Sequence, residues 1–170
     1  TLPNAHDRSV RDEAQTPSEE EAAADETEAL GSAELGVPDQ FPSAARHRIP
    51  GGRVERLDRG TGPPVLLVHG FPLDHTMWSS QIDALAERWR VIAPDLRGFG
   101  QSSLGDADPA RGIALEQYAD DVAALLDVLL VTEPIVLAGF SMGGYIAWQV
   151  VRKYMSRLRA LIQIDTRAAA

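Results

Sequence analysis

The chain has 170 residues, no cysteine and a formal net charge of −9, from 16 Lys and Arg against 25 Asp and Glu. The length suits one domain with a core, and the acidic balance argues against a protein that binds nucleic acid or an anionic membrane. Without cysteine there is no disulfide, no thiolate metal site and no thiol nucleophile. No apolar stretch reaches the ~18 residues of a membrane span and no secretory signal is visible, so we expect a cytoplasmic protein.

Most of the negative charge lies near the N-terminus. Residues 1–50 carry 11 acidic and 4 basic side chains, a net of −7. Residues 1–45 hold few large apolar side chains, so we predict that they are disordered. Ser18 and Glu21 form a capping-box pattern that would allow a marginal helix over residues 19–30. A linker or leader and an acidic interaction tail are both compatible with this composition.

From about residue 46 the chain alternates between strand and helix patterns. Short apolar runs predict buried strands, and longer amphipathic stretches predict helices. The predicted strands are residues 46–49, 53–57, 64–68, 90–94, 135–138 and 158–164. The predicted helices are residues 77–89, 113–131 and 142–154. The first two strands flank Pro50-Gly51-Gly52 and should form a hairpin. The remaining alternation predicts a three-layer, doubly wound and mostly parallel sheet with helices on both faces.

The strongest chemical pattern is Gly139-Phe140-Ser141-Met142-Gly143-Gly144, which has the form G-x-S-x-G. It stands between a predicted buried strand and an apolar helix, the context that this motif requires. Such a turn lifts the Ser141 hydroxyl above the carboxyl edge of the sheet, at a helix N-terminus where the Met142 amide can stabilise an oxyanion. A glycine-rich turn without chemistry is the alternative, and the strand and helix on either side favour the nucleophile.

Two further motifs follow predicted strands. In His69-Gly70-Phe71-Pro72, Gly70 would let the backbone approach a ligand and the Phe71 amide would be a second oxyanion donor. We interpret His69 as a structural histidine at a strand end. The second motif, residues 95–102, is a glycine-containing turn that we interpret as scaffold.

The sequence predicts no cofactor and no metal. Gly98 and Gly100 do not complete a dinucleotide-binding G-x-G-x-x-G, because residue 103 is Ser. Asp74 and His75 could hold a metal ion, but an exposed loop pair is the favoured interpretation.

Together, VLLVHGFP, VIAPDLRGFGQS, IVLAGFSMGGYIAW and LIQIDTRA resemble the α/β-hydrolase superfamily over residues 46–170. The resemblance is nearest to small esterases, enol-lactonases and non-metal perhydrolases. It implies a Ser141 nucleophile, oxyanion donors from Phe71 and Met142, and a histidine base oriented by an acid, in the chain order Ser, Asp or Glu, His. The strand-to-helix turn that carries the nucleophile is called the elbow, here residues 139–143. The dehalogenase and epoxide hydrolase branches have Asp in place of the serine at the elbow. The expected substrate-binding residues are Gly70, Phe71, Phe140 and Met142.

The sequence departs from the family in its histidines. His6, His47, His69 and His75 all precede Ser141. We therefore expect residues 46–170 to be the N-terminal portion of a hydrolase domain, truncated after about the sixth strand, with the catalytic histidine beyond it. Asp165 is a candidate acid, but the favoured interpretation is that it lines the pocket base or caps the next turn.

The resulting hypothesis is a serine hydrolase of ester, lactone or related acyl bonds, whose partner is a small acyl substrate rather than nucleic acid or a membrane. The 170-residue chain alone should be inactive, because a serine without a base is a poor nucleophile. A non-catalytic binding module or an inactive fragment of the same fold is the alternative. The oligomeric state is open.

Overall fold

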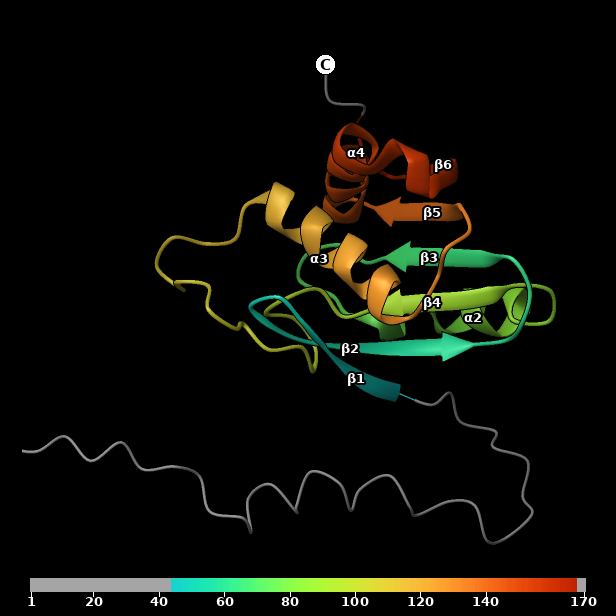
Figure 1. The fold of residues 1–170 in the computed structure, drawn as a ribbon, viewed down its shortest axis with the longest axis horizontal. Coiled ribbons are helices and arrows are strands. Elements are labelled where there is room, and N and C mark those ends of the chain that lie inside the picture. The colour runs from blue at the N-terminus through green and yellow to red at the C-terminus, as the bar shows by residue number, and fades with distance from the viewer. Residues whose placement is uncertain (1–43, 168–170) are drawn as a thin grey trace, which may run out of the picture. The chain divides into compact units, whose positions relative to one another are not determined.

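The computed structural model describes residues 44–167, and the predictions for residues 1–43 lie outside the described part. Within it, one six-stranded sheet has the order β1-β2-β4-β3-β5-β6 (Figure 1). The strands are β1 Ala44–Ile49, β2 Gly52–Arg59, β3 Pro64–Val68, β4 Arg90–Pro94, β5 Ile135–Phe140 and β6 Leu158–Ile164. The helices are α2 Ser79–Leu85, α3 Leu115–Val128 and α4 Met142–Tyr154, with 3₁₀ turns η2 His75–Trp78 and η3 Met155–Arg157.

Four strands of the sheet are parallel. β3 pairs with β4 on one side and β5 on the other, and β6 extends the sheet beyond β5. β1 and β2 form the predicted antiparallel hairpin, and β2 pairs antiparallel with β4. Because the chain leaves β3 in one direction to form β4 and returns across it to form β5, the strand order reverses at β3. Ligands of open α/β sheets bind at the carboxyl ends of the strands beside such a reversal.

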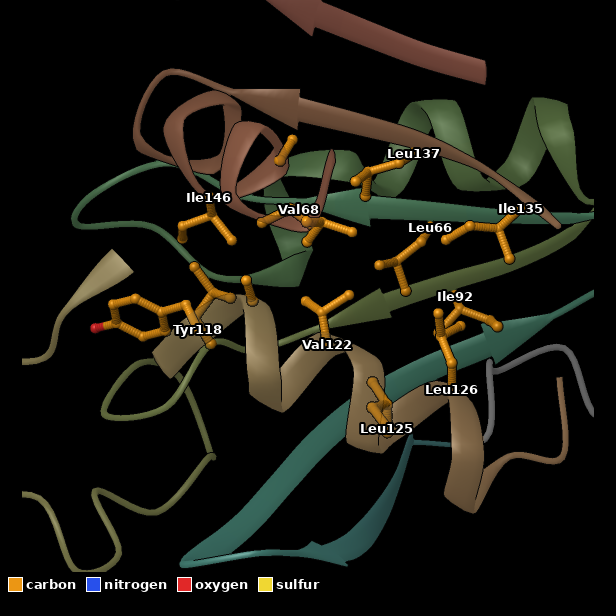
Figure 2. Close-up of a cluster of buried hydrophobic side chains, with 14 of the residues drawn as sticks. Leu66, Val68, Ile92, Tyr118, Val122, Leu125, Leu126, Ile135, Leu137 and Ile146 are labelled. Carbon is orange, nitrogen blue, oxygen red and sulfur yellow. The ribbon is translucent and has the colours of Figure 1, made fainter. Parts of the chain in front are cut away.

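Helices cover both faces of the sheet, which confirms the predicted three-layer class. On one face α3 and α4 pack against the strands, and Figure 2 shows Val122 and Leu126 of α3 directed toward Leu66 and Ile92. On the other face the η2–α2 segment places Trp78 and Ile82 against the opposite side chains of the same strands. Every residue of β3 is buried, as expected for a central strand covered on both sides.

Two of the three predicted helices are shorter in the structure than in the sequence analysis. The segment predicted as 77–89 begins as the η2 turn, capped by the Asp74 side chain, and α2 ends at Leu85. The segment predicted as 113–131 is α3, which ends because Leu130 adopts a left-handed conformation with φ 53°. β3, β4, α4 and β6 have the predicted bounds.

A buried ion pair fastens the hairpin to the sheet. Arg97 donates from Nε to Asp121 Oδ2 at 2.7 Å and from Nη2 to Asp121 Oδ1 at 2.6 Å. The same guanidinium donates to the carbonyls of Pro50 and Gly51 in the hairpin turn. Hydrogen bonding to Asp121 raises the pKa of Arg97. One side chain therefore links three segments: the β1–β2 turn, the loop after β4 and α3.

None of the helices described between residues 44 and 167 is long and apolar enough to cross a membrane.

Candidate active site

Ser141 occupies a strained turn between β5 and α4. Its backbone has φ 49° and ψ −113°, a region that residues other than glycine rarely adopt. The turn also approaches the neighbouring backbone closely, since a Cβ on Gly143 would overlap the carbonyl oxygen of Val68 at the end of β3. A Cβ on Gly139 would overlap Gly143 itself. The spacing of glycines in G-x-S-x-G thus has a steric cause in this fold.

The amides of the elbow differ in what they bind. The Ser141 amide donates to the carbonyl of Ile164 in β6 at 3.0 Å, and the Gly144 amide donates to the Ser141 carbonyl at 2.9 Å. For the Met142 amide, no acceptor occurs among residues 44–167. Because Met142 is the first residue of α4, this N–H is one of the donors that a helix N-terminus leaves unpaired.

The loop after β3 lies against the elbow. A Cβ on Gly70 would lie 2.8 Å from Cδ1 and 3.2 Å from the carbonyl oxygen of Phe140, so Gly70 permits this close approach. Phe71 follows with 68% of its surface exposed, and its ring meets Phe99 edge-on at 5.8 Å. The Phe71 amide, like that of Met142, has no acceptor within the described residues. The close approach shown by the structure is therefore that of Gly70 to Phe140, the residue before Ser141.

His69 is fully buried and is held by two backbone groups. Nδ1 lies 2.9 Å from the carbonyl oxygen of Gly70, which can only accept, so Nδ1 carries the proton. Nε2 accepts from the Leu96 amide at 2.9 Å. Burial lowers the pKa of His69, which favours this neutral form. The ring joins the ends of β3 and β4, which agrees with the structural role expected for it.

Asp165 follows β6 directly. Its backbone is left-handed, with φ 45°, and its side chain is exposed. The preceding residue, Ile164, accepts the hydrogen bond from the Ser141 amide, so Asp165 is adjacent in sequence to the residue that contacts the elbow. No described residue forms an ion pair or a side-chain hydrogen bond with its carboxylate.

Of the described histidines, His69 and His75 are hydrogen-bonded to groups other than Ser141. The His75 amide donates to Asp95 Oδ1 at 2.9 Å, and His75 Nδ1 is hydrogen-bonded to the same oxygen at 2.6 Å. His47 lies on β1, at the opposite edge of the sheet from β6. His6 falls outside the described residues. No histidine of residues 44–167 is hydrogen-bonded to the Ser141 hydroxyl.

Asp74, His75 and Asp95 form the one group of three potential metal ligands within the described residues. Their atoms already have protein partners. Asp74 Oδ1 accepts from the amide and the hydroxyl of Thr76, and Asp95 accepts from His75 and from the Gln101 amide at 2.8 Å. Asp95 is fully buried, so it organises the two loops that it joins. The loop after β4 is scaffold, as its glycine-containing sequence predicts, but that sequence does not indicate the bond between Asp95 and His75.

The fold and the elbow match one family. A family profile described as alpha/beta hydrolase fold matches residues 63–169, well over half of the chain. The chain belongs to the alpha/beta hydrolase fold family. This membership confirms the resemblance stated from the sequence.

Among proteins of this family, a thermophilic esterase from Thermogutta terrifontis superposes with a TM-score of 0.68 at 50% identity, over 74% of this chain and 47% of that one. The N-acyl homoserine lactonase AidH superposes with a TM-score of 0.69 at 30% identity, over 76% of this chain and 47% of that one. Bifunctional epoxide hydrolase 2 of Sus scrofa is 35% identical over 131 residues, which are 74% of this chain and 23% of the relative. The chain thus spans half or less of the length of these alpha/beta hydrolases.

Proposed function

We propose that this chain carries the nucleophile and the oxyanion hole of a serine hydrolase that cleaves small esters or lactones. The observation that carries the proposal is the strained turn at Ser141, supported by the Phe71 and Met142 amides, for which no acceptor occurs among residues 44–167. Amides that are free of protein acceptors and fixed beside a nucleophile stabilise negative charge as it develops on a carbonyl oxygen. The esterase and lactonase among the relatives act on substrates that contain such a carbonyl.

In the proposed reaction the Ser141 oxygen attacks the acyl carbon, and its proton passes to a histidine base. The carbonyl oxygen becomes the oxyanion held by the amides of Phe71 and Met142. The carbonyl then re-forms as the alcohol leaves, taking the proton from the histidine, and water releases the acid by the same route in reverse. Gly70, Phe71, Phe140 and Met142 contact the substrate, and the exposed Phe71 ring offers it an apolar surface.

The base is the part of the relay that residues 1–170 do not supply, because no histidine follows Ser141. As proposed, it is a histidine beyond this sequence, in a longer form of the protein. Asp165 is the proposed acid within the chain, on the ground that it follows β6 beside the elbow. The 170-residue chain alone is then expected to turn over substrate more slowly than the longer form by several orders of magnitude, since the loss of a triad member has effects of that size.

The relatives include an epoxide hydrolase, so the reaction class rests on Ser141. The serine oxygen forms an acyl-enzyme from an ester or lactone. The oxyanions that arise as this acyl-enzyme forms and breaks down can be stabilised by two backbone amides. An ester or lactone is therefore the proposed substrate class rather than an epoxide.

A fluorophosphonate probe tests this proposal. The longer form of the protein should become labelled at Ser141, and Ser141→Ala should abolish the label. Ser156→Ala, at an exposed serine just beyond α4, is the matched control and should leave labelling unchanged. A label that persists in Ser141→Ala would refute the nucleophile.

A non-catalytic binding module is the second candidate. It is favoured by one observation, that no described histidine is hydrogen-bonded to Ser141. It predicts that the 170-residue chain is stable, binds an acyl ligand at the elbow and never forms a covalent adduct in any longer form. Rapid proteolysis of residues 51–170 in the isolated chain would count against this candidate.

A further inference from the structure

The β1–β2 hairpin is the basic part of an acidic protein. Its two strands carry five arginines and two carboxylates, a net of +3 in a chain of net −9. Three of these arginines, Arg46, Arg59 and Arg56, have carboxylate neighbours: Arg46 pairs with Glu55 at 2.8 Å, Arg59 pairs with Asp83, and Arg56 lies 3.4 Å from Asp58. The two remaining arginines, Arg48 and Arg53, have no such carboxylate neighbour within residues 44–167.

Arg48 and Arg53 face each other across the hairpin. They are Cα partners in the antiparallel register, so their side chains project from the same face of the sheet. Both are exposed, and neither forms an ion pair with any carboxylate of residues 44–167. Like charges placed directly opposite each other destabilise a strand pair. The neighbouring pair on the same face, Arg46 and Glu55, shows the complementary arrangement.

A surface cavity of about 410 Å³ opens between these two arginines. Its other lining residues are Ile49, Ser103, Asp106 and the glycines Gly51, Gly52 and Gly105. The Ser103 amide donates to the Arg53 carbonyl at 3.0 Å, and the Asp106 amide donates to the Gly51 carbonyl at 3.1 Å. These bonds fix the floor of the cavity. Its volume falls in the range of small-ligand sites, about 300–1,000 Å³.

We propose that this cavity binds an anion, with Arg48 and Arg53 holding the phosphate group of a soluble small molecule between them. Two guanidinium groups match the two charges of a phosphate dianion, and each can donate two parallel hydrogen bonds to its oxygens. The bound anion replaces the repulsion between the arginines with two attractions. Asp106, on the wall of the same cavity, opposes the anion and limits its affinity.

This site is separate from the elbow. β2 runs antiparallel to β4, with Arg56 opposite Pro94, so the hairpin turn lies at the carboxyl edge of the sheet, the edge that also carries Ser141. β4 and β3 stand between β2 and β5, which at about 4.8 Å per strand separates the two places by about 14 Å. The proposal therefore does not depend on the chemistry of Ser141.

Inorganic phosphate is the probe for the test. The full ¹⁵N-labelled chain is titrated with phosphate at pH 8 and constant ionic strength, with chloride replaced by phosphate. We expect saturable shifts of the Gly51, Gly52 and Ser103 amides. Arg48→Gln and Arg53→Gln should each weaken binding at least about fivefold, since each removes one of two charge-assisted contacts.

Arg59→Gln is the matched control, because it removes an arginine of the same hairpin that already has a carboxylate partner, and it should leave the affinity within about twofold. Asp106→Asn should tighten binding, because it removes the opposing carboxylate. The dispersion of amide signals far from the hairpin shows in the same spectra that each variant is folded. Shifts that never saturate, or equal affinities in Arg53→Gln and Arg59→Gln, would overturn the proposal.

Discussion

The backbone amide of Ser141 donates a hydrogen bond of 3.0 Å to the carbonyl of Ile164. This bond joins the elbow to the last residue of β6 and occupies the amide of the serine itself. The elbow therefore depends on three strands: β5 supplies its first residues, β3 receives its close backbone approach, and β6 accepts its hydrogen bond. These contacts hold Ser141 in a backbone conformation that is unfavourable for a serine outside the folded protein.

Ser141→Gly should raise the stability of the protein by about 1 kcal/mol. The φ of 49° is unfavourable for serine but not for glycine, and Ser141 makes no side-chain capping bond that the change would remove. Chemical denaturation measures the effect. Ser141→Ala keeps the Cβ and should gain much less. Ser156→Gly, in the 3₁₀ turn after α4, should lose stability instead. A loss of stability in Ser141→Gly would show that the turn is not strained.

Leu130→Gly should also stabilise the protein by about 1 kcal/mol, for a related reason. Leu130 ends α3 with φ 53°, while its amide donates to Asp127 and the Val131 amide donates to Leu126. These two bonds define a Schellman motif, whose left-handed position glycine favours. The leucine side chain is 82% exposed, so little burial is lost. Urea unfolding of Leu130→Ala, which retains the Cβ, provides the comparison, and an equal gain in both variants would contradict the explanation.

Arg97→Met should cost about 3–5 kcal/mol of unfolding free energy, because it leaves the carboxylate of Asp121 buried without its partner. The double variant Arg97→Met/Asp121→Leu should recover part of this loss, which a double-mutant cycle in urea would measure. Strictly additive losses would contradict the coupling. Arg111→Met, in the exposed pair with Asp108, should produce no measurable change.

Protein stability should fall as the pH drops below about 6.5, and His69 should contribute to this fall. Burial lowers the pKa of His69 in the folded state below the unfolded value of ~6.5. The unfolded chain then binds a proton that the folded chain does not, so stability is full above the unfolded pKa and declines below it, by up to about 1.4 kcal/mol per pH unit.

His69→Leu should flatten this pH dependence between pH 7 and 5, even though it lowers stability overall by leaving the Leu96 amide without its acceptor. His47 is the internal comparison, because burial also lowers its pKa, although its ring is only partly buried. His47→Gln should therefore flatten the same profile less. An unchanged slope in His69→Leu would show that this ring does not titrate with folding.

The periodic elements could be predicted from the sequence because local pattern determines them. The apolar run ending at Val68 and the amphipathic segment from Met142 give β3 and α4 their predicted bounds. The end of α3 could not be predicted in this way, because the left-handed residue there is Leu130 rather than the glycine that usually marks such an end.

The long-range polar contacts could not be predicted from the sequence either. The Arg97–Asp121 pair and the Asp95–His75 bond join residues 24 and 20 positions apart, and only the folded sheet brings them together. In the candidate site, the glycine spacing around Ser141 pointed to the strained turn. The roles assigned to Phe71, Met142 and Asp165 remain predictions.

The geometry around the elbow depends on the alignment of β3 with β5. Gly70 and Phe140 are 70 positions apart in the chain, and they approach each other because Val68 pairs with Gly139. A slip of two residues would keep every side chain on its original face, yet it would displace one loop from the other by about 6.6 Å. A two-residue insertion or deletion within β5 would therefore separate Gly70 from Phe140 while leaving a folded protein. For engineering of this chain, the pairing of these two strands is as important to preserve as the serine.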